Sequence, residues 1–111
     1  MTDKMIVLTT CATQEDAQRI ARTLVARRLA ACVNIVPNIT SVYRWQGAIE
    51  ESGEWLLVIK TAAGLLENLK EELPKMHPYE LPELVALNIV DGAEGYLNWL
   101  TAELDTGNDV A

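Results

Sequence analysis

The strongest constraint on the fold is a pair of long strand-like segments that share one tight turn. Residues 32–45, "CVNIVPNITSVYRW", alternate side chains with the period of two that is typical of a β-strand. The dipeptide "QG" at residues 46–47 predicts the turn, and the largely apolar residues 48–61 predict a returning strand. Residues 32–61 are therefore predicted to form one long hairpin.

Two features of the pattern bear on the shape of this hairpin. Pro37 cannot donate a ladder hydrogen bond, so we expect a bend, a bulge or an edge position there. Ser52–Gly53 is interpreted as a second bulge. Strict alternation along the first strand predicts a shared face for Val33, Ile35, Ile39, Tyr43 and Trp45.

The remaining segments alternate between strand and helix periods. Residues 5–10 predict a strand, and residues 14–29 predict an amphipathic helix with Thr13 as its N-cap. A second helix begins near residue 62 and is expected to end at Pro74. A fourth strand at 84–90 precedes a last helix capped by Asp91. The order predicts an α+β fold of the ferredoxin-like βαββαβ type, with an antiparallel sheet and a C-terminal helix.

Composition narrows the class of protein and its partners. The 111 residues, half of them apolar, suit one globular domain over residues 1–111, with residues 105–111 as a frayed tail. A net charge of −7 argues against nucleic acid and against an anionic membrane surface as partners. No apolar run reaches the ~20 residues of a membrane span. Two cysteines and a start without secretion features indicate reduced thiols and a cytoplasmic location.

The hairpin is predicted to outgrow its own domain. Residues 33–45 would reach about 43 Å when extended at ~3.3 Å per residue, whereas a domain of this length is about 34 Å across. A free ribbon with apolar side chains needs cover, and sister chains in a closed ring would supply it. The alternative is a hairpin that folds back onto its own sheet. The side chains that need cover are Ile39, Val42, Tyr43, Trp45, Ile49 and Trp55.

The chain's one histidine, His77, lies in "KMHPYELPE" at residues 75–83. Topology places Cys11 at one end of the sheet and Cys32, Lys60 and His77 at the other, so Cys11 would reach them only from a neighbouring subunit. A thiol and an imidazole suit copper or zinc, and Cys–His catalysis is an alternative that lacks a visible orienting group. In a third interpretation His77 is a hydrogen-bonded connector and both cysteines are small core residues.

Several segments together resemble one known family. "RLAACVNIVPNITSVYRWQGAIEESGEWLLVIKT", "HPYELPE" and "YLNWL" are similar to the divalent-cation tolerance (CutA) family over about Met5 to Leu104. The resemblance implies a homotrimer akin to the PII regulatory trimers, in which long hairpins wrap neighbouring subunits. It also implies a link to copper and other divalent cations. The cleft residues that it implies are Cys32, Tyr43, Trp45, Lys60, His77 and Tyr79.

The resemblance further implies metal ligation by a thiol near the end of the first strand and by the histidine before "PY". Cys11 and His77 are the matching residues. Met76 stands where some relatives carry a second histidine, and residues 9 and 10, where the thiol can also sit, are threonines. The remaining sulfur and nitrogen ligands would favour Cu(I) over Zn(II).

Three functional hypotheses remain open at the level of sequence. The first is a cytoplasmic trimer, not an enzyme and without a required cofactor, that weakly binds copper or other divalent cations through Cys11, Cys32 and His77. The second is a PII-like regulator that binds a small anion or metabolite through Lys60. The third is a stable assembly module whose cleft holds no ligand.

Overall fold

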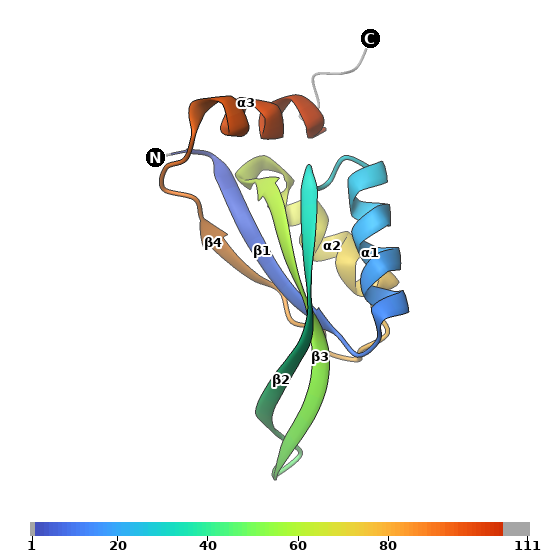
Figure 1. Cartoon of the computed structure of the whole chain (residues 1–111). Helices are drawn as coiled ribbons and strands as arrows, with labels where there is room; N and C mark the ends of the chain where they lie inside the picture. Colours follow the sequence, from blue (N-terminus) through green and yellow to red (C-terminus); the bar gives the residue numbers. More distant parts are fainter. Residues whose placement is uncertain (1, 106–111) are drawn as a thin grey trace.

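The computed structural model describes residues 2–105, which form one four-stranded sheet with two helices packed on one face and the C-terminal helix across the end of the sheet opposite the hairpin tip (Figure 1). The elements in chain order are β1 (Lys4–Cys11), α1 (Gln14–Ala26), β2 (Cys32–Trp45), β3 (Ala48–Ala62), a 3₁₀ turn (Ala63–Leu65), α2 (Leu66–Met76), β4 (Val85–Asn88) and α3 (Glu94–Glu103). The strand order is β2-β3-β1-β4, and every neighbouring pair is antiparallel. The predicted α+β βαββαβ order with a C-terminal helix is confirmed.

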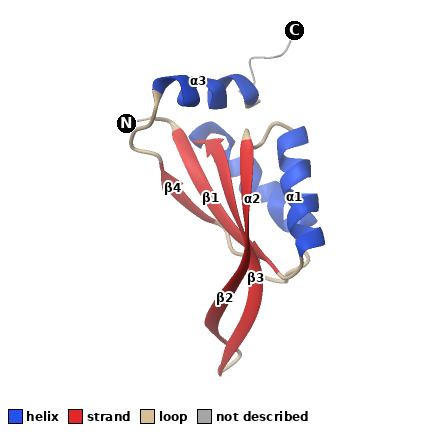
Figure 2. Ribbon diagram, in the orientation of Figure 1, coloured by secondary structure: helices blue, strands red, loops and turns tan. Residues whose placement is uncertain are grey.

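The hydrophobic core lies between the sheet and helices α1 and α2 (Figure 2). Side chains alternate across the sheet, so Val7 and its partner Ile59 point toward the helices and are fully buried. On the other face Val85 and Leu87 of β4 are 46% and 49% exposed. No described helix is both long and apolar enough to cross a membrane. One sheet face is thus covered by helices and the other is left open.

Helix α1 begins as its sequence predicts and ends earlier than predicted. The Thr13 hydroxyl accepts a hydrogen bond from the Asp16 amide at 3.1 Å, which caps the first turn. The helix ends at Ala26, because Arg28 adopts a left-handed φ of 58°. The Leu29 amide then bonds back to the Leu24 carbonyl, which closes the helix end.

The long hairpin is confirmed. Strands β2 and β3 pair from Cys32–Lys60 to Trp45–Ala48, and the turn residues Gln46 and Gly47 have φ angles of 50° and 82°. Two positive φ angles in a two-residue loop match the twist of antiparallel strands. The distal half of the hairpin extends beyond the rest of the subunit (Figure 1), whose longest dimension is 49 Å against 28 and 22 Å for the others.

The bulge predicted near Pro37 is present and changes which way the hairpin's side chains point. The register shifts between Val36 and Ile39, so β2 carries one residue more than β3 there, and Asn38 has a φ of 59°. One inserted residue moves every later side chain to the opposite face. The interpretation of Ser52–Gly53 as a second bulge is wrong, because both residues pair in regular register.

The predicted shared face of β2 is therefore wrong. Val33 pairs with Ile59 and faces the helices, as does Ile35. Beyond the bulge, Ile39, Tyr43 and Trp45 lie on the open side of the sheet, since Ile39 pairs with Glu54. The tip residues Val42 and Ile49 face the other way and are 63% and 70% exposed.

The C-terminal third departs from prediction at its element boundaries. Pro74 lies inside α2, which continues to Met76, because proline removes only one amide near the end of the helix. Strand β4 is four residues long instead of seven. Asp91 accepts from the next amide, and α3 begins at Glu94 after Ala93. Of the predicted frayed tail, Asp105 is hydrogen-bonded to Arg28, and residues 106–111 lie outside the described chain.

The bulge generates a stability prediction. Asn38→Ala is expected to lower the free energy of unfolding by about 1 kcal/mol, because alanine disfavours the left-handed region that Asn38 occupies. Asn38→Gly should cost nothing, since glycine adopts that region freely. Denaturant titration at equal chain concentration measures both. Asn98→Ala on the exposed side of α3 is the control and should lose no stability. An Asn38→Ala variant as stable as the parent chain would contradict the argument.

Candidate functional site

The site lies at the end of the sheet where β1 ends and β4 does not reach. Strand β4 pairs only with residues 5–8 of β1, so residues 9–11 have no strand neighbour on that edge. The segment that follows α2 covers this edge instead. The His77 ring donates from Nε2 to the Thr10 carbonyl at 2.8 Å. The imidazole thus satisfies a buried strand carbonyl that β4 leaves unpaired.

Both ring nitrogens of His77 have hydrogen-bond partners. Nδ1 accepts from the Tyr79 amide at 3.1 Å, while Nε2 carries the proton donated to Thr10. The His77 side chain is 7% exposed and its ring lies 4.7 Å from the Tyr79 ring, centroid to centroid. The ring is therefore fixed in one tautomer and one orientation, and each ring nitrogen already has a hydrogen-bond partner.

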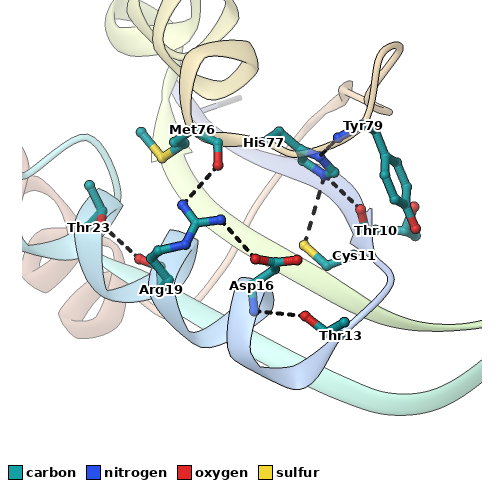
Figure 3. Close-up of polar contacts among 9 residues, drawn as sticks. All are labelled: Thr10, Cys11, Thr13, Asp16, Arg19, Thr23, Met76, His77 and Tyr79. Carbon is teal, nitrogen blue, oxygen red and sulfur yellow. Dashed lines mark hydrogen bonds and ion pairs between the residues drawn. The ribbon is translucent and has the colours of Figure 1, made fainter.

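The Cys11 thiol lies beside the ring. Its Sγ is 3.9 Å from His77 Nε2, although 66 residues separate the two in the chain (Figure 3). Cys11 is fully buried, and this burial, together with the nearby Asp16 carboxylate, raises the pKa of its thiol to about 11. The thiol is therefore protonated at neutral pH, which makes it a weak nucleophile.

Helix α1 anchors the segment that carries His77. The Arg19 guanidinium donates to the Met76 carbonyl at 2.9 Å and to the Asp16 carboxylate at 3.0 Å (Figure 3). These bonds join the end of α2 to the start of α1, and the Arg19 hydrogen bond lowers the pKa of Asp16. The backbone before His77 is thereby held against the end of β1.

The predicted grouping of the site residues is wrong in one respect. His77 was expected beside Cys32 and Lys60, with Cys11 at the far end of the sheet. Both β3 and β4 run antiparallel to β1, so α2 must return along the sheet before β4 begins. That return brings His77 to the end where Cys11 lies. A Cys11–Cys32 disulfide remains excluded, and both thiols are free.

Cys32 and Lys60 pair with each other at the opposite end of the hairpin strands. The Lys60 amine donates to the Asn34 side-chain oxygen, and the Cys32 thiol lies 4.0 Å from the same oxygen. Tyr96 of α3 is close by, and burial and the Cys32 thiol raise its pKa. The seven residues predicted for the site therefore divide between two places in the subunit.

The other predicted cleft residues line a pocket of about 560 Å³ between the projecting hairpin and the segment that follows α2. Tyr43 and Trp45 contribute from β2 and Tyr79 from the segment after α2. The bulge makes this possible, because it turns Tyr43 and Trp45 to the open side of the sheet. The remaining lining residues are Thr10, Ser41, Val42, Glu54, Glu80, Leu81 and Glu83.

Sequence reasoning missed the carboxylates of this pocket. Glu54 is only 6% exposed, and the Tyr79 hydroxyl donates to its Oε2 at 2.5 Å. Burial and this bond raise the pKa of Tyr79, and desolvation followed by the Glu54 charge raises the pKa of Glu83. The sequence did contain one signal, because Glu54 begins the apolar run "EWLLVI". A carboxylate in a buried strand needs a polar partner, so its position predicts a nearby hydrogen-bond donor.

Three metal ligands do not come together within the described part of one chain. No group of three His, Cys, Asp or Glu side chains in residues 2–105 is arranged to hold an ion. The structure brings Cys11 and His77 together but leaves Cys32 apart. One subunit by itself therefore supplies a two-ligand pair, which is too few for a structural metal centre.

The two cysteines should differ sharply in reactivity. In the native protein at pH 8, iodoacetamide is expected to alkylate the partly exposed Cys32 well before the buried Cys11. A pKa of about 11 leaves roughly 0.1% of Cys11 as thiolate at that pH. Peptide mass spectrometry of timed samples measures both rates, and the two should converge once guanidinium unfolds the chain. Faster labelling of Cys11 in the native protein would refute this description.

Comparison with known proteins agrees with this fold over nearly the whole chain. The profile of the family described as "CutA1 divalent ion tolerance protein" matches residues 5–103. A divalent-cation tolerance protein CutA from Thermus thermophilus is 52% identical over 95 residues, which are 86% of this chain and 92% of the relative. The mouse protein CutA is 47% identical over 82% of this chain, which spans about half (51%) of that relative's length.

Solved structures give the same result. CutA from Xylella fastidiosa superimposes with a TM-score of 0.90 at 41% identity, covering 94% of this chain and all of that one. CutA1 from Oryza sativa gives a TM-score of 0.89 at 42% identity, covering 91% and 93%. The family description and the name of the Thermus thermophilus relative both refer to tolerance of divalent cations. The chain belongs to the CutA1 divalent-ion tolerance family.

Proposed function

We propose that this protein acts in divalent-cation tolerance as a cytoplasmic homotrimer that binds copper or another soft cation weakly, without catalysis and without a resident cofactor. The observation that carries the proposal is the buried contact between Cys11 and His77, at 3.9 Å between Sγ and Nε2. Thiolate and imidazole are the ligands that soft and borderline metals prefer. The free state of both thiols suits a reducing compartment, although relatives carry names such as "chloroplastic" and "periplasmic".

The donor chemistry of this pair fits a cation only after rearrangement. The Sγ–Nε2 separation is shorter than two Zn ligand bonds laid end to end, roughly 2.3 plus 2.0 Å, so one ion could touch both atoms. Binding must remove the Cys11 proton, whose pKa is about 11, and must shift the Nε2 proton to Nδ1, which costs the bonds to the Thr10 carbonyl and from the Tyr79 amide. Both steps oppose binding, which is why we expect weak affinity that increases with pH.

A third ligand would have to come from water or from another subunit. Cys32 is the candidate that the sequence supplies, and it lies at the other end of its own sheet. The Cys32 of the same subunit therefore cannot join Cys11 and His77, and only the Cys32 of a neighbouring subunit could do so. A three-ligand site in a cleft between subunits thus depends on self-association.

Self-association is supported by the apolar surface that one subunit leaves uncovered. The open sheet face carries the exposed side chains of Val36, Val85 and Leu87, and the hairpin tip carries Val42 and Ile49. Large exposed apolar patches are uncommon on monomers and mark interaction sites. A closed ring of identical subunits covers a sheet face and a projecting hairpin at the same time.

Metal titration tests the cation proposal. Under anaerobic conditions, Cys11→Ser and His77→Ala are each expected to weaken Cu(I) binding by about tenfold or more, since each removes one ligand. Competition with a calibrated Cu(I) chelator measures the affinity at pH 6, 7 and 8, and affinity should rise with pH. Lys70→Ala on the exposed side of α2 is the control, because Lys70 belongs to neither the Cys11–His77 pair nor the surroundings of Cys32 and should not affect Cu(I). Cu(I) affinity that ignores both Cys11 and His77 would refute the proposal.

The assembly proposal has its own test. Sedimentation equilibrium is expected to give three times the chain mass of 12.3 kDa. Val85→Glu, at 46% exposure on the open sheet face, should lower that mass because a carboxylate would be buried between subunits. Val25→Glu, at 42% exposure on α1, is the control and should leave the trimer intact. A monomer at micromolar concentration would refute the trimer.

A second function is favoured by the environment of Lys60. Within the described chain its amine is bonded to the neutral Asn34 side chain and forms no ion pair. An amine without a counter-charge on an open sheet face suits a small anion, as in a PII-like regulator. Saturable metabolite binding that Lys60→Ala abolishes and His77→Ala leaves intact would favour this function. If neither Lys60→Ala nor His77→Ala alters the binding of any metal or metabolite tested, the third hypothesis is favoured, namely an assembly module without a ligand.

A further inference from the structure

The pocket between the hairpin and the segment after α2 has a one-sided charge within one subunit. Three of its ten lining residues, Glu54, Glu80 and Glu83, are carboxylates, and none is basic. No ion pair in residues 2–105 involves any of the three. Desolvation and the Glu54 charge raise the pKa of Glu83, so the Glu54 and Glu83 carboxylates repel each other. A cation in the pocket would relieve that repulsion.

Glu54 is the least exposed of the three and points into this pocket. Its side chain is 6% exposed, and its hydrogen bond from Tyr79 reaches Oε2 alone. Within the described residues no second hydrogen bond reaches the carboxylate, and Oε1 is not among the buried side-chain atoms that lack a partner, so it stays open to solvent. A largely buried carboxylate with one accessible oxygen can accept a hydrogen bond from a ligand or from ordered water.

The walls of the pocket are aromatic and suit an organic cation better than a bare metal ion. Tyr43 and Trp45 lie on the same side of the hairpin, where the bulge has turned them, and Leu81 adds an apolar surface. Aromatic faces attract ammonium groups by cation–π interaction and also contact aliphatic carbon. A volume of about 560 Å³ is typical of sites for small molecules. No three-ligand metal arrangement exists here within the described chain.

We propose that this pocket binds a small organic ammonium cation, with the ammonium group between Glu54 and Glu83 and its carbon skeleton against Tyr43 and Trp45. The ammonium donates hydrogen bonds to the carboxylates, and the aromatic rings and Leu81 cover the aliphatic part. This site uses neither Cys11 nor His77 as a ligand. It therefore goes beyond the cation-tolerance proposal, and it rests on the proposed trimer only in that neighbouring subunits leave this pocket open.

Calorimetric titration tests the site with one matched pair of probes. The sample is the assembled protein, treated with chelator and kept at constant low ionic strength. The diamine 1,4-diaminobutane is expected to bind saturably with one site per chain. Its neutral counterpart 1,4-butanediol has the same length and should bind about tenfold more weakly or worse, because it lacks the charge. Equal binding of diamine and diol, or no saturable diamine binding, would overturn the proposal.

Matched variants locate the binding. Glu54→Gln and Glu83→Gln keep the side-chain shape and are each expected to weaken diamine binding by about tenfold. Trp45→Leu should weaken it by several-fold, since it removes the aromatic face. Glu94→Gln at the exposed start of α3 removes an equal charge elsewhere and should leave binding unchanged. If Glu94→Gln weakens binding as much as Glu83→Gln does, the effect is only net charge and the site is refuted.

Two further measurements keep the outcomes separable. Circular dichroism and sedimentation of each variant show whether it folds and assembles, and Glu83→Gln at the exposed pocket rim remains a fair test if the buried Glu54→Gln does not fold. Cys11→Ser should leave diamine binding intact, while Glu83→Gln should leave Cu(I) affinity intact. Loss of Cu(I) binding alone would refute the metal proposal, and loss of diamine binding alone would refute this one.

Discussion

One extra residue in strand β2 determines what the hairpin presents to the rest of the subunit. Before the shift between Val36 and Ile39, the alternate side chains of β2 belong to the helix-covered core. After it, Tyr43 and Trp45 point to the open side, where Glu54 and the segment after α2 lie. Without the insertion the period of two would carry the aromatic residues to the opposite face. The pocket exists because the bulge separates a core-forming half of the strand from a surface-forming half.

A second constraint is the short length of β4. A strand that continued to pair with residues 9–11 of β1 would satisfy the Thr10 carbonyl with a backbone amide and leave no role for an imidazole. Because β4 begins only at Val85, that carbonyl takes its hydrogen bond from His77 instead. The histidine is thereby placed against Cys11 and fixed in one tautomer. A gap in the sheet is what creates a buried thiol–imidazole contact in a chain with one histidine.

The sequence predicted the elements well and the site incompletely, for physical reasons. Periodicity, the Thr13 cap, the Gln46–Gly47 turn and Pro37 are local signals, and each identified its element or bulge. The side of the sheet that Tyr43 faces depends on whether an odd or an even number of residues is inserted before it. Pro37 indicates an irregularity in the strand but not the number of inserted residues. The neighbour of His77 depends on the direction in which α2 returns, which is a property of the whole topology.

Carboxylates were the hardest residues to recognise from sequence. Glu54 looks like an ordinary charge at the border of a strand, and only the packing of Tyr79 over it shows that it is buried. Glu80 and Glu83 follow "HPY" in a segment without periodicity, so nothing local relates them to β3. Their proximity to Glu54 results from the same covering segment that carries His77.

Tyr79 connects the Cys11–His77 pair with the carboxylate pocket. Its backbone amide donates to His77 Nδ1, and its hydroxyl donates to Glu54 Oε2. A cation at Nδ1 would displace the Tyr79 amide directly, and a cation at Nε2 would need the Nε2 proton to move to Nδ1, which then no longer accepts from that amide. Displacement of that backbone would carry the phenol away from Glu54 and leave a buried carboxylate without its only hydrogen bond from the described chain. Attachment of a metal at either ring nitrogen therefore breaks the Tyr79 amide bond and is opposed by the carboxylate in the pocket. Attachment at Nε2 also breaks the Thr10 bond, but Nε2 is the nitrogen that faces the Cys11 sulfur, so it is the atom at which one ion would bind both side chains.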